Sequence, residues 1–159
     1  DQDLNSAMQN SVNWYFQAID SQLGINRVQE FLNKIEYGNQ TTSSNLDLYW
    51  SDFSLKISPL EQVTLLKKFN TNEFHLNSQN VFSVKNAIKI ASTPNGNFYG
   101  KTGTGRVSGQ DINGWFIGYV ETSDNSYYFA TNIQSDSNAT GKKAFEITSD
   151  ILKKLHIWN

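Results

Sequence analysis

The sequence predicts an α+β fold in which an antiparallel sheet is flanked by helices. Apolar residues recur at helical spacing over about residues 4–91, and the period changes to that of strands from about residue 98. A last helical pattern follows the strands and reaches residue 158. Strands that are grouped together, rather than alternating with helices, are typical of such a sheet. We therefore expect residues 1–159 to belong to one domain.

Four helices are predicted before the strands. The first covers residues 4–23, and Gly24 follows as its stop. Asn26 is expected to cap a second helix, which ends before Tyr37. The polar segment 40–45 that follows is expected to be a loop.

The third helix has a clear predicted start. Ser58 can cap it, Pro59 fits its first turn, and Glu61 can complete a capping box. A fourth helix is expected over residues 77–91, before a turn at 93–96. The residues of the second to fourth helices that are expected to face inward are Val28, Phe31, Leu32, Ile35, Leu60, Val63, Leu66, Phe69, Val81, Phe82 and Ile88.

Three segments rich in aromatic and β-branched residues are predicted strands, at 98–104, 114–122 and 127–134. A tight turn at 123–126 makes the last two an antiparallel hairpin. Both faces of the middle strand are apolar, so we expect layers on both sides of the sheet. Three strands make a thin sheet for that, which indicates that N-terminal strands are absent from this chain. The final predicted helix, 141–158, has an inward face of Ala144, Ile147, Ile151 and Leu155.

Composition excludes several classes of site and partner. The net charge of -2 favours no nucleic-acid partner, and the absence of cysteine excludes disulfides and thiolate chemistry. Only two histidines occur, far apart, so we expect no metal site and no other cofactor. No stretch is long and apolar enough to span a bilayer, and no signal peptide precedes Asp1. Any membrane anchor is therefore expected outside this chain.

The segment Tyr99-Gly100-Lys101-Thr102-Gly103-Thr104-Gly105 carries the first chemical signal. Lys101 offers a positive charge to an anionic ligand, and Thr102 can hydrogen-bond a carboxylate. The glycines allow a ligand to approach the backbone, where N–H groups can stabilise an oxyanion. Alone, this tripeptide motif is common and also fits a glycine-rich hairpin with a surface lysine.

Further motifs accompany Lys101-Thr102-Gly103 in a specific order. They are Ser11-Val12-Asn13, Tyr37-Gly38-Asn39, Tyr49-Trp50, the segment 54–63 and Gly114-Trp115-Phe116-Ile117-Gly118-Tyr119. Together they resemble the class D serine β-lactamases and, more closely, the C-terminal penicillin-binding domain of the staphylococcal-type β-lactam sensor-transducers. The resemblance covers residues 6–155 and implies the fold of serine β-lactamases and penicillin-binding proteins, here as one partial transpeptidase-like domain.

The resemblance implies a role for each motif. Ser11 matches a serine that takes part in proton transfer with the β-lactam nitrogen, and Trp50 matches a tryptophan that hydrogen-bonds a carbamylated lysine. Lys101, Thr102 and Gly103 match the motif that holds the ligand carboxylate. The backbone N–H of Thr104 matches a donor of the oxyanion hole, and residues 37–39 match a structural corner.

Asn13 departs from the pattern of the hydrolytic class D enzymes, which usually carry Val or Ile there. An amide at this position can hydrogen-bond the bare amine of the lysine and favour loss of its carbamate. The acyl-enzyme would then persist, as a receptor requires. A second departure is Lys142, in a region where many class D enzymes have an arginine for the carboxylate. Lys142 either substitutes for it or simply belongs to a solvated helix start.

The nucleophile of the family lies in a Ser-x-x-Lys motif, and no serine in this sequence has a lysine three residues later. Related proteins place this motif a few dozen residues before Ser11, so it is expected upstream of Asp1. The partners that the resemblance implies are β-lactam antibiotics, the remainder of the domain with Ser-x-x-Lys, and a transmembrane and protease part of the parent protein.

Three functions compete at this point. The favoured one is the extracellular β-lactam sensor of a Gram-positive membrane transducer, acylated by penicillins but deacylated very slowly. The second is a secreted class D β-lactamase. The third is a non-enzymatic carbohydrate- or protein-binding module, which the ordered motifs disfavour.

Overall fold

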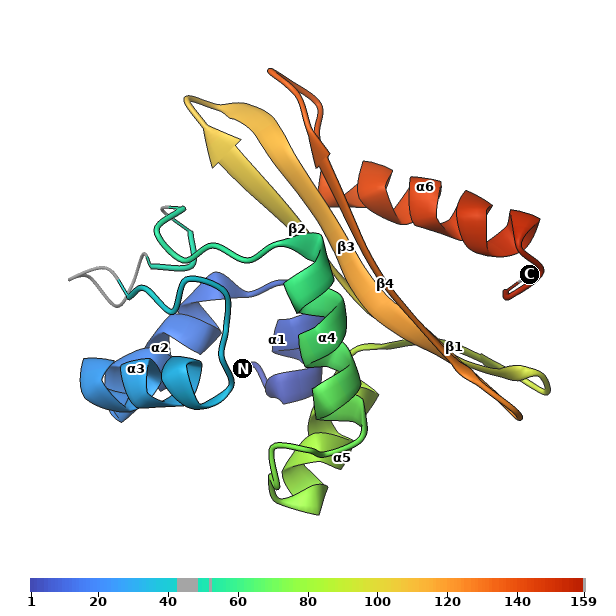
Figure 1. The fold of residues 1–159 in the computed structure, drawn as a ribbon. Coiled ribbons are helices and arrows are strands. Elements are labelled where there is room, and N and C mark those ends of the chain that lie inside the picture. Colours follow the sequence, from blue (N-terminus) through green and yellow to red (C-terminus); the bar gives the residue numbers. More distant parts are fainter. Residues whose placement is uncertain (43–48, 52, 159) are drawn as a thin grey trace. The chain divides into compact units, whose positions relative to one another are not determined.

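The computed structural model describes residues 1–42, 49–51 and 53–158, which contain six helices and four strands (Figure 1). They divide into two compact units, Asp1–Ile88 and Lys89–Asn159. The first unit is helical, and the second holds the sheet and one helix. The predicted α+β class with an antiparallel sheet is confirmed. The expectation that both units belong to one domain stays a prediction.

The predicted first helix is two helices, α1 (Leu4–Gln9) and α2 (Asn13–Leu23). The side-chain amide of Asn10 donates to the carbonyl of Ser6 at 2.9 Å, an alternative to continuing the helix. Val12 then caps α2 with extended backbone. The apolar period does not reveal this break because Met8 and Val12 keep nearly helical spacing across it.

Helix α3 (Ile25–Lys34) is capped by Gly24 at φ 78°, so the prediction of Asn26 as its cap is wrong. One glycine thus ends α2 and begins α3. Val28 and Leu32 are buried as predicted, whereas Phe31 is 45% exposed. Of the predicted loop 40–45, residues 43–45 lie outside the described residues.

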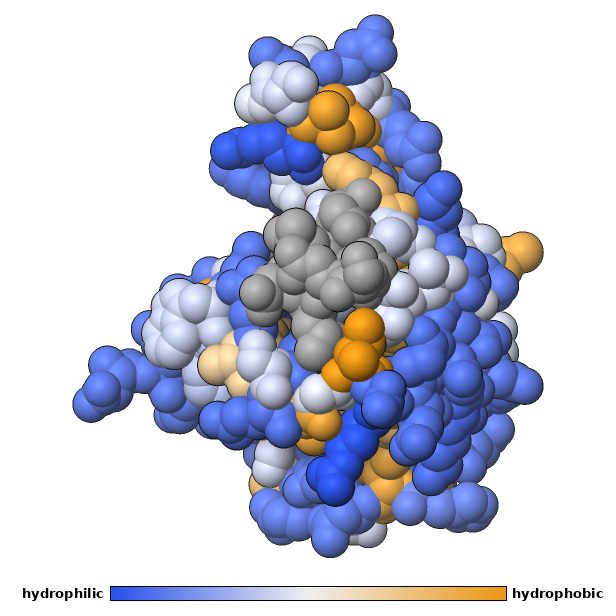
Figure 2. All heavy atoms as spheres, turned by 90° about the vertical axis from the view of Figure 1, so that its left-hand side faces the viewer, coloured by the Kyte–Doolittle hydropathy of each residue, from blue (hydrophilic) through white to orange (hydrophobic). Residues whose placement is uncertain are grey.

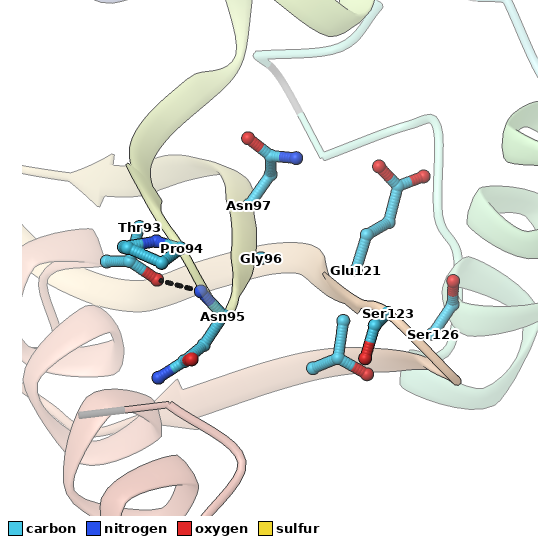
Figure 3. Close-up of a pocket in the computed structure, with 9 residues that line it drawn as sticks. Thr93, Pro94, Asn95, Gly96, Asn97, Glu121, Ser123 and Ser126 are labelled. Atoms are coloured by element: carbon cyan, nitrogen blue, oxygen red, sulfur yellow. Dashed lines mark hydrogen bonds between the residues drawn. The ribbon is translucent and has the colours of Figure 1, made fainter.

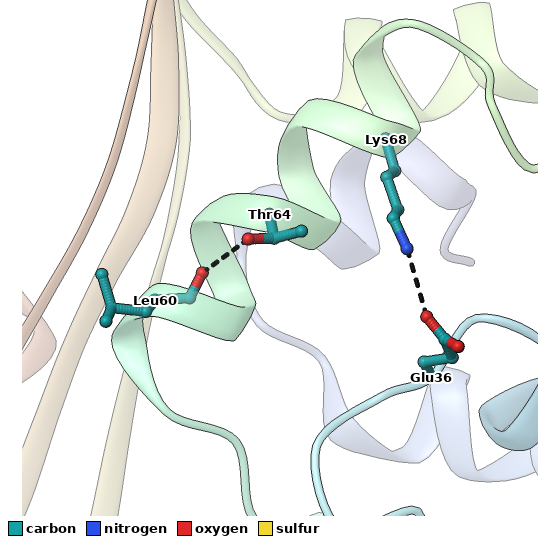
Figure 4. Close-up of polar contacts among 4 residues, drawn as sticks. All are labelled: Glu36, Leu60, Thr64 and Lys68. Carbon is teal, nitrogen blue, oxygen red and sulfur yellow. Dashed lines mark hydrogen bonds and ion pairs between the residues drawn. The ribbon is translucent and has the colours of Figure 1, made fainter.

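Helix α4 (Pro59–Asn70) begins as predicted, with both bonds of the Ser58–Glu61 capping box present. Leu66 is buried, but Leu60 is 82% exposed and does not belong to an inward face. Figure 4 shows two polar contacts along this helix. Thr64 donates to the Leu60 carbonyl at 3.0 Å, and Lys68 pairs with Glu36 at 3.2 Å. The ion pair is solvent-exposed and contributes at most about 1 kcal/mol.

Helix α5 (Ser78–Ala87) is shorter than the predicted helix over 77–91. Asn77 caps it, Val81 is buried, and Phe82 is 58% exposed. The segment after Ala87 is a strand, β1 (Lys89–Thr93), which the sequence analysis missed. A five-residue strand acquires its conformation from pairing with β2, which local periodicity does not reveal.

The second unit is built on a four-stranded antiparallel sheet of order β1-β2-β3-β4. The other strands are β2 (Gly96–Val107), β3 (Gln110–Thr122) and β4 (Ser126–Gln134), each longer than predicted. The predicted turns at 93–96 and 123–126 connect β1 to β2 and β3 to β4. The register places Tyr99 beside Tyr119 and Tyr119 beside Tyr128.

Helix α6 (Gly141–Lys154) packs on one face of this sheet (Figure 1). Phe98, Phe116 and Val120 meet Ala144 and Leu152 in the core of the unit. The inward face of α6 consists of Gly141, Ala144, Thr148 and Leu152. The predicted inward residues Ile151 and Leu155 are 48% and 61% exposed. Ala144 is buried as predicted, but Thr148 and Leu152 take the inward positions expected for Ile151 and Leu155.

The exposed apolar residues do not form one large patch on the face drawn in Figure 2, where hydrophilic residues predominate. The most exposed large apolar side chains among the described residues are Leu60, Leu155, Trp14 and Phe82. No helix within the described ranges has the length and apolar character needed to cross a membrane.

Candidate functional site

Ser11 lies in the break between α1 and α2, not on a helix as its sequence context suggests. Its φ of 51° is in the left-handed region, which non-glycine residues seldom adopt. Asn13 follows as the first residue of α2, and both residues are exposed. Eight other described non-glycine residues also have a positive φ, so this conformation sets how Ser11 is presented but does not by itself mark a functional position.

Trp50 is held to α2 by a carboxylate. The indole N–H of Trp50 donates to Asp20 Oδ2 at 3.3 Å, and the hydroxyl of Tyr49 donates to the same oxygen at 3.2 Å. Burial, followed by the charge of Asp20, raises the pKa of Tyr49 above its usual value. Asp20 is seven residues after Asn13, so the two lie on the same side of α2 about 10 Å apart along its axis.

The corner at Tyr37-Gly38-Asn39 fixes the chain that follows Trp50. The Asn39 side chain accepts from Lys56 N–H and donates to the Ser54 carbonyl, both at 2.8 Å. The backbone N–H of Asn39 also donates to the Lys56 carbonyl at 2.9 Å. Gly38 has a φ of 47°, and a Cβ there would lie 1.8 Å from the Lys56 carbonyl oxygen. The corner therefore binds residues 54–56 through Asn39, and position 38 requires glycine.

Lys101, Thr102, Gly103 and Thr104 lie on β2 beyond the end of its pairing with β1. That pairing reaches Tyr99, so residues 100–107 form an outer edge of the described sheet. An outer edge leaves backbone N–H and C=O groups available to a ligand. Such an arrangement can hold an extended acyl group and stabilise negative charge on it.

The charged group among Lys101, Thr102, Gly103 and Thr104 is the Lys101 ammonium, which donates to the Thr102 carbonyl at 2.8 Å. Partial burial lowers the pKa of Lys101 below its usual value. Nearby, burial and the neighbouring Glu121 raise the pKa of Tyr99 to about 12. Farther along the same edge, the Arg106 guanidinium pairs with Asp111 at 2.7 Å.

The first residue of α6, Gly141, packs against residues 102–104 of β2. Thr104 Oγ1 accepts from the Gly141 N–H at 2.9 Å, so its hydroxyl faces α6. A Cβ on Gly141 would lie 2.6 Å from the Gly103 carbonyl oxygen and 2.9 Å from Thr102 Cβ. Alternation along the strand places Thr102 on the side of Thr104, and Lys101 on the other side. Lys142, the next residue of α6, is exposed.

The predicted site residues thus form two sets. Ser11, Asn13 and Trp50 belong to the first unit, where Asp20 connects Trp50 to the helix that Asn13 begins. Lys101 to Thr104 are contiguous on the edge of β2 in the second unit. Their individual roles stay predictions.

A polar pocket lies elsewhere in the second unit, at the ends of its two tight hairpins (Figure 3). Thr93–Asn97, Glu121–Ser123 and Ser126 line it, and none of the predicted site residues is among them. Across the described ranges, no three His, Cys, Asp or Glu side chains gather closely enough to hold a metal ion.

Comparison with known proteins decides the family. The family described as penicillin binding protein transpeptidase domain matches residues 1–153. This chain belongs to that family.

Sensors of this family are more similar to the chain than the class D β-lactamases are. The methicillin resistance mecR1 protein of Staphylococcus aureus is 44% identical over 99% of this chain. The structure of the C-terminal domain of the Bacillus licheniformis BlaR penicillin-receptor matches 99% of the chain with a TM-score of 0.94 and 46% identity. A class D β-lactamase from Bacillus subtilis matches 98% with a TM-score of 0.89 and 37% identity. The predicted resemblance and the penicillin-binding-protein-like fold are confirmed.

The chain spans only part of each relative. It covers 27% of the mecR1 protein, 64% of the solved receptor domain and 63% of the solved β-lactamase.

The structure also shows two positions that the sequence did not reveal, namely Asp20 and Gly141. The seven-residue spacing from Asn13 to Asp20 could have indicated the first, whereas the approach of Gly141 to Gly103 joins distant segments and leaves no local signal.

Proposed function

We propose that this chain is the larger part of a receptor domain that β-lactam antibiotics acylate and that induces β-lactam resistance through a membrane signal transducer. The observation that carries the proposal is the higher identity to named regulatory sensors than to class D β-lactamases. Asn13 at the start of α2 supports it, because an amide there favours a bare lysine amine.

Each of the two sets of residues has its own role in this proposal. Lys101, Thr102 and Gly103 bind the ligand carboxylate, and the Thr104 N–H stabilises the oxyanion. Ser11 transfers a proton to the departing β-lactam nitrogen. The serine that forms the acyl bond belongs to a Ser-x-x-Lys motif in the remainder of the domain, so residues 1–159 act as one partial domain together with it.

The parent protein places this domain on the extracellular face of the membrane. Its transmembrane and protease part, outside this chain, carries the signal inward. Upstream gene sequence with several transmembrane helices and a His-Glu-x-x-His motif is the expected finding. A secretory signal peptide alone would favour a secreted class D β-lactamase, for which the 37% identity to a solved enzyme of that class is the supporting observation.

The test is the lifetime of the adduct in the complete domain, which joins this chain to the segment with Ser-x-x-Lys. After labelling with a fluorescent penicillin, we expect the acyl bond to persist for hours. Asn13→Val should speed its release about tenfold or more, because it removes a hydrogen bond to the lysine amine. Rapid turnover of the unmodified domain would establish the β-lactamase instead, and an unchanged rate in Asn13→Val would refute the role of Asn13.

A further inference from the structure

Asp20 is a carboxylate on α2 for which the sequence motifs assign no role. One of its oxygens, Oδ2, accepts from both Tyr49 and Trp50, two consecutive residues from a loop about thirty positions later. Tyr49 is 8% exposed and packs with Val28 and Leu32, and Trp50 packs against the same cluster. The carboxylate therefore fixes an aromatic pair whose remaining surface is apolar.

The bond to Trp50 has a chemical consequence. An indole has one N–H donor and no acceptor. When that donor is bound to a carboxylate, Trp50 has no hydrogen bond left to give to an anionic base or to a water molecule. It then contributes only the face and edge of an apolar ring to its surroundings.

Two further hydrogen bonds hold the residue that precedes Trp50. Leu55 N–H and Ser54 Oγ both donate to the Tyr49 carbonyl at 3.0 Å. The Asn39 side chain also binds the backbone of Ser54 and Lys56. Of the hydrogen bonds described here, the one to Asp20 is the one that the indole N–H of Trp50 itself makes.

We infer that Asp20 is a positioning residue that withholds the Trp50 N–H from the acylation site and so prolongs the acyl adduct. This inference rests on the proposed function, because it concerns the same site. A donor that is released from Asp20 can orient a water or stabilise an anionic base, and either effect promotes hydrolysis of the acyl ester. Hydrolysis adds water across the ester, frees the serine hydroxyl and releases the opened antibiotic as a carboxylic acid.

The experiment compares acyl release in the complete domain after labelling with a fluorescent penicillin. Asp20→Ala should raise the release rate about tenfold, the size expected for a lost hydrogen bond to a charged group, and Asp20→Asn should have a smaller effect. Tyr49→Phe keeps the Asp20–Trp50 bond and should leave release nearly unchanged. Gln22→Ala, an exposed change on the same helix, is the matched control.

A double-mutant cycle separates positioning from a general structural role. In a Trp50→Phe background, Asp20→Ala should have no further effect on release, because the donor is already absent. An effect of equal size in both backgrounds would overturn the inference, as would an unchanged rate in Asp20→Ala alone.

Indole fluorescence provides a readout that does not depend on the antibiotic. The emission difference between the parent domain and Asp20→Ala should vanish when both carry Trp50→Phe. If the parent forms no lasting adduct, the proposed function fails, and the fluorescence difference still decides whether Asp20 holds Trp50. If the adduct lasts but the difference is absent, only the inference about Asp20 fails.

Discussion

Lys101 is a cation whose charge is lost at a lower pH than that of a free lysine. Partial burial disfavours the ammonium and lowers its pKa from the ordinary 10.5. Capture of an anionic ligand should therefore decline on the alkaline side before pH 10.5. The acylation rate of the complete domain, measured against pH, tests this. Lys101→Arg should abolish the decline over the same range, because a guanidinium stays charged.

The lowered pKa of Lys101 affects ligand capture and folding stability in opposite directions as the pH rises. Between the lowered pKa and 10.5, the unfolded chain binds more protons at Lys101 than the folded one, so the contribution of Lys101 to stability rises with pH. A decline in acylation caused by titration of Lys101 is therefore not accompanied by a loss of stability from Lys101 itself, whereas a decline caused by alkaline unfolding is also seen in Lys101→Arg. A decline that remains in Lys101→Arg would contradict the assignment of Lys101 as the carboxylate-binding group.

At the scale of elements, the close approach of α6 to β2 depends on Gly141. Gly141→Ala places a methyl group 2.6 Å from the Gly103 carbonyl and 2.9 Å from the Gly103 nitrogen, so strand or helix must move. We expect a loss of about 1–3 kcal/mol in unfolding free energy. Acylation should slow as well, since Thr104 loses its fixed position. Denaturant titration and labelling rates measure the two effects.

The matched change at the same helix start is Lys142→Ala. Lys142 is exposed, so its removal should alter neither stability nor acylation appreciably. If Lys142→Ala slows acylation, Lys142 does act as the substitute for an arginine at the ligand carboxylate. If Gly141→Ala changes neither quantity, the contact does not position the edge of β2.

Sequence reasoning succeeded where one segment contains its own signal. The Ser58–Glu61 capping box and the turns at 93–96 and 123–126 depend on neighbours in sequence, and all of them were correct. It failed where distant segments decide. Strand β1 depends on pairing with β2, and the phase of α6 depends on which residues meet the sheet.

The same division holds in the candidate site. The motifs located Ser11, Trp50 and Lys101, because each occurs in a recognisable order. The left-handed conformation of Ser11 depends on how α1 ends, and the partner of Trp50 lies about thirty residues away on α2. Spacing alone specifies neither.

On the scale of the whole molecule, these 159 residues should bind covalently to no penicillin. No serine in the sequence has the lysine three positions later that the family uses for activation, so no hydroxyl here has that neighbouring base. The isolated chain incubated with a fluorescent penicillin should show no band after denaturing electrophoresis, while the complete domain does. A labelled band from the isolated chain would mean that another hydroxyl is the nucleophile. Its loss in Ser11→Ala would identify Ser11, and Ser11 would then act on the ligand directly rather than through proton transfer.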